Sequence, residues 1–304
     1  AIESLDDGQA IILDNIRKHE DEMKELRPEE HAKSDLVREL EPLFDVYVNN
    51  AFSNCHRPHA SMIGFTNLPR IAGPLVVSEV RAAERAKQHA ESPIIYILGG
   101  VKIFDYFDLI DKSLEEGKVD KILASGTLGE LCIIAEGKKL GKKESFLGKK
   151  DSMEKKSLLD LVPKVRSLLD QHPDVFEVPE DLAEDDNGRK EISTEDLPTD
   201  KDIWDIGTKT AERFAGIIKK ARTIYLKGAP GDYRITGFSK GSEIVIKAIA
   251  SSDAYSLIGG GSAADLVGLY SDKGSFSHVS LAGGALMEYM SGKKLPALEF
   301  LASG

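Results

Sequence analysis

Three times in this chain a short apolar segment runs directly into a cluster of glycines, and each time a pattern typical of a helix follows. The three segments are Ile94–Lys102, Ala254–Ser262 and Ser277–Gly284. Glycine lets the backbone approach an anion closely, and the first amides of the next helix point towards it. Three such turns predict a parallel sheet whose carboxyl edge binds phosphate groups.

Strands and helices alternate regularly after Pro93, which is typical of an α/β fold with a mostly parallel sheet. We expect strands at 94–98, 120–125, 223–227, 255–258 and 277–281. We expect helices at 104–116, 127–136, 156–170, 208–221, 239–251, 262–269 and 284–291.

Two polar stretches interrupt this alternation. Residues 138–156 hold eight lysines, which predicts a solvated face or a flexible loop. Residues 183–202 are acidic and contain turn-forming residues, so we expect a loop there as well.

The part of the chain before Pro93 has a weaker pattern. Residues 10–15 are a strand candidate, 18–35 carry a helical charge pattern, and 45–49 form a second strand candidate. Residues 51–59 are too polar and irregular for a core element, which predicts a loop. Residues 78–91 predict one long helix that could join two domains.

Composition limits the classes of function. The net charge of −11 argues against a general nucleic-acid binder, although a local basic cleft can still take a phosphorylated metabolite. Cys55 and Cys132 provide neither a metal site nor a disulfide framework, so we expect a reducing, cytoplasmic location. No apolar run approaches the roughly 18 residues of a membrane span, and no secretory signal is visible.

Several motifs occur in one fixed order along essentially the whole chain. They are Asp45–Phe52, His56–Ser61, Leu98–Lys102, Asp205–Gly207, Lys227–Gly231, Gly259–Gly261, His278–Gly284 and Ser291–Leu298. In this order they resemble the phosphoglycerate kinase family, particularly its archaeal members.

The resemblance implies two Rossmann-like parallel-sheet domains joined by a long helix, with the first domain incomplete here. Residues 1–77 correspond to part of the acid-substrate domain and 78–92 to the interdomain helix. Residues 93–284 correspond to the nucleotide-binding domain, and 285–304 to a tail that returns towards the first domain. The implied activity is reversible phosphoryl transfer between ATP and 3-phosphoglycerate in glycolysis, with Mg²⁺ as cofactor. Such transfer needs positioning and cationic neutralisation more than covalent chemistry. The implied partners are small molecules, not nucleic acid or membrane.

The resemblance also assigns roles to individual residues. Arg17, His56 and Arg57 match substrate-binding positions, and a planar guanidinium suits both carboxylate and phosphate. Each arginine could instead form a surface salt bridge, and His56 could cap a turn. The residues that match catalytic positions are Lys102, Gly283 and Gly284. Those that match the nucleotide cleft are Gly100, Val101, Lys102, Gly126, Gly207, Gly228, Gly231, Arg234, Gly260, Gly261, Ser262 and Ala263.

The chain also departs from the family pattern. The family's amino-terminal strands do not precede Ala1, so we expect the 304-residue chain by itself to have little activity. Arg234 stands where the family has an acidic ribose-binding residue, and Ser262 where it has a metal-associated aspartate. Tyr106 stands at a second lysine of many members, and Lys227 at the asparagine of the usual Asn-Gly-Pro. These departures leave open a non-catalytic nucleotide-binding paralogue with a regulatory role, or a kinase acting on another small phosphorylated acid.

Overall fold

The computed structural model describes residues 2–151 and 155–303, and the chain forms two compact units. Unit 1 comprises residues 1–81 and 284–304, and unit 2 comprises residues 82–283. The boundary falls within the long helix α4 (Pro74–Gln88). In the described part of the chain no helix is both long and apolar enough to cross a bilayer.

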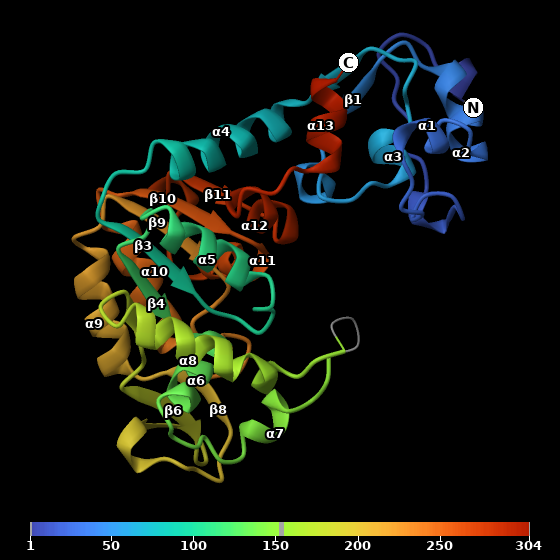
Figure 1. The fold of residues 1–304 in the computed structure, drawn as a ribbon. Helices are drawn as coiled ribbons and strands as arrows, with labels where there is room; N and C mark the ends of the chain where they lie inside the picture. Colours follow the sequence, from blue (N-terminus) through green and yellow to red (C-terminus); the bar gives the residue numbers. More distant parts are fainter. Residues whose placement is uncertain (1, 152–154, 304) are drawn as a thin grey trace. The chain divides into compact units, whose positions relative to one another are not determined.

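Unit 2 is built on a six-stranded sheet that is parallel throughout, as the sequence predicts (Figure 1). The strand order is β11-β10-β9-β3-β4-β5. Its strands are β3 (Ile94–Leu98), β4 (Lys121–Ala124), β5 (Phe176–Glu177), β9 (Thr223–Lys227), β10 (Tyr255–Gly259) and β11 (His278–Ser280). This is the strand order of a doubly wound dinucleotide-binding fold. In such a fold the first strand lies in the middle of the sheet, the second and third are added on one side of it, and the fourth to sixth on the other. Here the switch point between the two sides lies between β3 and β9.

Alternating side chains on the central strands pack against helices on both faces of the sheet. Ile95 and Ile97 of β3 belong to a buried cluster with residues of α9 (Thr208–Ile218), α10 (Lys240–Ala250) and α11 (Gly261–Tyr270). Tyr96 points to the other face, where its hydroxyl accepts a hydrogen bond from Ser113 of α5 (Tyr106–Glu115). Successive residues of a strand point to opposite faces, so two layers of helices are needed to bury β3.

The remaining helices of unit 2 follow β4. They are α6 (Gly126–Ala135), α7 (Glu144–Leu147) and α8 (Val162–Gln171), with a 3-10 turn at Leu158–Leu161 before α8. The prediction of a wholly solvated stretch at 138–156 is wrong in part, because Leu140 and Leu147 are buried. Residues 152–154 of this stretch lie outside the described residues.

The predicted loop at 183–202 is wrong. The structure has a three-stranded antiparallel sheet there, in the order β7-β6-β8, formed by β6 (Asp181–Asp185), β7 (Arg189–Ser193) and β8 (Ile203–Ile206). The missed signal is Asn187-Gly188, a dipeptide that adopts the positive φ angles of a hairpin turn (+59° and +124°). Of the charged residues in this stretch, Asp185, Lys190 and Glu191 are exposed, whereas Glu184 of β6 is buried.

Unit 1 contains a short parallel pair of strands, β1 (Tyr47–Asn49) and β2 (Arg70–Ala72), and a small apolar cluster around Val37 and Phe65. Its C-terminal helix α13 (Pro296–Ala302) contacts β2 and α3 (Ala60–Ile63). The other helices of unit 1 are α1 (Pro28–His31), α2 (Asp35–Leu40) and α12 (Gly284–Met290).

Two expectations for the first forty residues are wrong. Residues 10–15 form no strand, because no described segment pairs with them, and Ile12 is 96% exposed. Residues 18–35 form turns and the single helical turn α1 instead of a longer helix. In both places the local pattern lacks an apolar surface to bury against, and packing supplies most of the stability of short elements.

Candidate functional site

A cavity of about 870 Å³ opens at the carboxyl ends of the unit 2 strands, at the switch point between β3 and β9. Such crevices are the usual ligand sites of open α/β sheets. The residues that line it are Gly100–Lys102, Tyr106, Gly126, Thr127, Glu130, Lys142, Lys143, Ser145, Phe146, Lys149, Asp202–Trp204, Lys227–Ala229, Gly231–Arg234, Gly259–Ala263 and Gly283.

Two glycine turns form one wall of the cavity and are hydrogen-bonded to each other. The amides of Gly99 and Gly100 donate to the carbonyls of Lys227 and Ala229, at 2.8 and 2.7 Å. Gly228 has φ +77°, and an added Cβ would lie 2.2 Å from the Gly99 oxygen. No side chain fits at that position, so the close contact between the turns requires glycine.

Tyr106 supports these turns from behind. Its buried hydroxyl donates to the carbonyl oxygen of Gly99 at 2.6 Å and lies 3.3 Å from that of Lys227. Burial raises the pKa of this phenol, so it remains a hydrogen-bond donor. Tyr106, which stands where many family members have a second lysine, therefore stabilises the two glycine turns at the switch point.

A third glycine turn precedes α11. Gly260 has φ +92°, and helix α11 begins at Gly261. The first amides of a helix have no partner within it and favour negative charge. Ser262 and Ala263 belong to this first turn and line the cavity, as the sequence predicts for a phosphate-binding turn.

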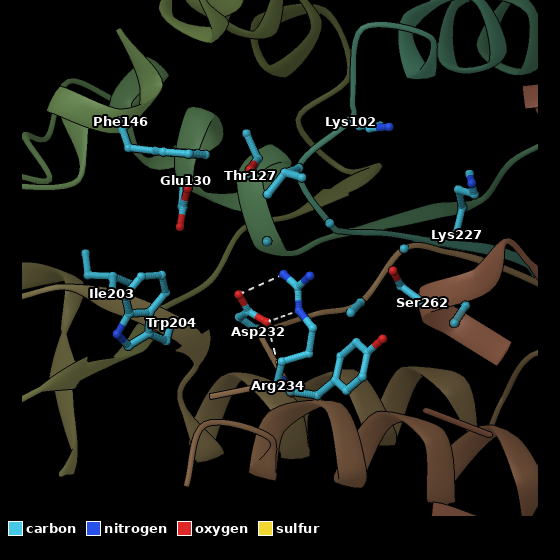
Figure 2. A pocket seen from close by; sticks show the side chains of 18 of the residues that line it. Lys102, Thr127, Glu130, Phe146, Ile203, Trp204, Lys227, Asp232, Arg234 and Ser262 are labelled. Atoms are coloured by element: carbon cyan, nitrogen blue, oxygen red, sulfur yellow. Dashed lines mark hydrogen bonds and ion pairs between the residues drawn. The ribbon is translucent and has the colours of Figure 1, made fainter. Parts of the chain in front are cut away.

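Lys102 and Lys227 place two cations at this end of the cavity (Figure 2). Lys102 is exposed, whereas Lys227 is partly buried. Burial lowers the pKa of Lys227, and the positive charge of Lys102 acts in the same direction, while Asp105 opposes both. The two ammonium groups are thus near enough to influence each other.

The other end of the cavity carries aromatic and paired charged side chains (Figure 2). The Lys143 ammonium lies 3.0 Å from Glu130 and also stands over the rings of Phe146 and Trp204, at 5.6 and 5.3 Å from their centroids. Burial raises the pKa of Glu130, and Lys143 partly offsets this. Flat apolar rings beside a few polar groups suit a planar ligand such as a nucleobase.

Arg234 lines the cavity, but its guanidinium is paired with a carboxylate. It pairs with the neighbouring Asp232, its Nε 2.8 Å from Oδ1, and its side chain is 73% exposed. Gly207 does not line the cavity, because it begins α9 and packs against the carboxylate of Asp181. The other predicted nucleotide-binding residues and Gly283 do line it.

The predicted acid-binding residues all lie in unit 1. Arg57 donates from Nε to Nε2 of His56 at 3.3 Å, and the His56 ring lies against Gly284, where an added Cβ would be 3.2 Å from Nε2. Burial lowers the pKa of His59; Glu22 opposes this, and the charges of Arg57 and Arg17 add to it. The charges of Arg17 and Arg57 are therefore near enough to His59 to influence it.

The residues around the cavity do not form a magnesium site by themselves. In the described residues no three His, Cys, Asp or Glu side chains gather in a way that could hold a metal ion. The acidic side chains that line the cavity are engaged: Glu130 with Lys143, Asp202 with Lys142 and Asp232 with Arg234. Mg²⁺ keeps several waters and prefers substrate phosphates, so the nucleotide itself would have to supply most of its ligands.

Sequence reasoning missed several residues of this site. Glu130, Lys143, Phe146 and Trp204 come together only because α6, α7 and β8 meet at the cavity. Lys227 had a visible signal, since it is the last residue of a buried strand and directly precedes Gly228.

The fold and the cavity define a class of α/β protein with a nucleotide-sized, phosphate-favouring site at the switch point of a doubly wound sheet. The family model "Phosphoglycerate kinase" matches residues 1–293. A phosphoglycerate kinase of Methanopyrus kandleri is 37% identical over 303 residues, 98% of this chain and 73% of that protein. One of Thermoplasma acidophilum is 36% identical over 99% of this chain and 73% of its own length. The crystal structure of phosphoglycerate kinase from Pyrococcus horikoshii OT3 superimposes with a TM-score of 0.86 at 34% identity, covering 95% of this chain and 71% of that one. The chain belongs to the phosphoglycerate kinase family.

Proposed function

We propose that this protein catalyses reversible phosphoryl transfer between ATP and 3-phosphoglycerate, the glycolytic reaction for which its relatives are named. The observation that carries the proposal is the convergence of three glycine turns and two lysines on one cavity of about 870 Å³ at the switch point of unit 2. Because the chain belongs to the phosphoglycerate kinase family, we propose ATP and 3-phosphoglycerate as its particular substrates. The alternative of a non-catalytic paralogue has no observation in its favour.

In this proposal unit 2 binds the nucleotide. The amides of the Gly260 turn and the ammonium of Lys102 hold its phosphates, and Phe146 and Trp204 flank its base. Mg²⁺ held by the nucleotide phosphates would supply charge neutralisation there. Backbone amides need no reorganisation when negative charge moves during the transfer, which is the main requirement of this reaction class.

Unit 1 binds the acid. Arg17 and Arg57 are its guanidinium groups near His59, and paired N–H donors match both the carboxylate and the phosphate of 3-phosphoglycerate. His56 holds Arg57 through the Nε–Nε2 hydrogen bond and so orients it. A cytoplasmic location, expected from the two cysteines, stays a prediction.

The test is a coupled assay with Mg-ATP and 3-phosphoglycerate, run on the protein as its gene encodes it and on the 304-residue chain. We expect turnover from the former on the order of 1–100 s⁻¹. Lys102→Met should lower that rate, whereas Lys220→Met, at an exposed lysine that does not line the cavity, should not. Absence of turnover with nucleotide binding intact would favour the paralogue.

A further inference from the structure

Lys227 lacks a direct carboxylate partner. In the stretches 2–151 and 155–303 no carboxylate forms an ion pair with its ammonium and its Nζ makes no hydrogen bond, although the more distant charge of Asp105 raises its pKa. Three other cations of the cavity have carboxylate partners: Lys142 with Asp202, Lys143 with Glu130, and Arg234 with Asp232. Taking an ammonium partly out of water without a partner costs free energy, so its retention calls for a ligand.

The backbone fixes the point from which this side chain extends. Lys227 is the last residue of β9, which lies between β3 and β10. Its Cα is paired with Leu98 on one side and Gly259 on the other, and its carbonyl accepts from the Gly99 amide. The side chain of Lys227 therefore starts from a strand paired on both sides, unlike that of Lys102, which extends from a turn.

The ammonium of Lys227 lies next to two glycine turns. A Cβ added to Gly260 would lie 2.7 Å from Nζ of Lys227, and one added to Gly283 would lie 3.5 Å from it. Gly260 immediately precedes the first turn of α11, so the ammonium stands beside the free amides of that helix. Figure 2 shows Lys227 and Lys102 at the end of the cavity where Ser262 lies.

We propose that Lys227 binds the terminal phosphates of the bound nucleotide and is a catalytic residue of this protein. This rests on the proposed function, since it names a further residue of the same site. The ammonium and the α11 amides approach one phosphate group from two sides, and glycine is favoured at position 260 because φ +92° strains other residues. As charge shifts from one phosphate oxygen to another, a cation set on the rigid sheet remains in place to balance it.

The experiment compares Lys227→Met with Lys220→Met, which removes an exposed cation of unit 2 that does not line the cavity. Binding of tripolyphosphate, ATP and adenosine is measured by calorimetry. Because hydrogen bonds to charged groups contribute more than neutral ones, we expect Lys227→Met to weaken tripolyphosphate and ATP binding about 10- to 100-fold. Adenosine binding should be unchanged, and Lys220→Met should have less than about a threefold effect.

A second readout separates this role from a structural one. Without ligand, Lys227→Met should melt at the same or a higher temperature than the parent, because it removes an unpaired buried charge. Tripolyphosphate should then raise the melting temperature of the parent more than that of the variant. A variant that melts lower but binds tripolyphosphate like the parent would overturn the proposal and leave the proposed function standing. A parent that binds neither tripolyphosphate nor ATP would overturn both.

Discussion

Replacing Gly228 by alanine tests whether contact between two glycine turns determines the stability of unit 2. Gly228 has φ +77°, and its added Cβ would lie 2.2 Å from the oxygen and 2.5 Å from the carbon of Gly99. Both are backbone atoms, so no side-chain rotation can relieve the overlap. Gly237 provides a matched control, because it has φ +87° but nothing within 4 Å of an added Cβ.

The magnitude follows from two terms. A left-handed conformation costs an L-residue roughly 1–2 kcal/mol, and both variants carry this cost. Forcing an extra carbon into a packed region costs about 1–3 kcal/mol more, and only Gly228→Ala carries that cost. We therefore expect a loss in the free energy of unfolding of about 2–5 kcal/mol for Gly228→Ala and about 1–2 kcal/mol for Gly237→Ala.

The assay is guanidinium denaturation followed by the fluorescence of Trp204, the single tryptophan of the chain, which lies in unit 2. ATP binding should fall in Gly228→Ala, because the turn must move away from Gly99 and break the 2.8 Å bond from Gly99 to Lys227. It should be unchanged in Gly237→Ala. Equal loss of stability in the two variants would refute the close-contact argument.

Three further predictions concern other parts of the molecule. Because the pKa of Lys227 is lowered in the free protein, binding of tripolyphosphate in the alkaline range below the ordinary lysine pKa of 10.5 should take up a proton in the parent but not in Lys227→Met, as calorimetry in buffers of different ionisation enthalpy would show. Burial raises the pKa of Asp205 to about 6 despite its Arg189 partner, so the folded state holds this proton more tightly and its contribution to stability should fall as pH rises from about 4 to about 6; Asp205→Asn should flatten that part of the denaturation profile. Phe300→Ala should destabilise unit 1 by about 3 kcal/mol, measured by hydrogen exchange, because the ring is buried against Tyr47 and the Arg70 guanidinium; Phe300→Leu, which leaves a smaller cavity, should cost less.

The sequence by itself determined the doubly wound sheet of unit 2 and the position of its phosphate-favouring turns. Strand β3 at 94–98 and strand β9 at 223–227 are predicted to the residue. These strands are buried on both faces and are therefore continuously apolar, and each is followed by glycine, so local sequence carries the signal. The same local signal located Lys102 and the Gly260 turn.

Only the tertiary structure decided the rest of the site. Glu130 and Lys143 are separated from Trp204 by about sixty residues or more, yet they share one end of the cavity, and no local pattern connects them. Residues 10–15 resemble a strand, but a strand forms only where another can pair with it. The sequence shows that residue 227 is a lysine. Only the folded structure, in which β3, β9 and β10 bring the glycine turns around it, shows that its ammonium has no direct carboxylate partner. Charge, burial and pairing depend on neighbours that the chain acquires by folding, which is why they cannot be read from the order of residues.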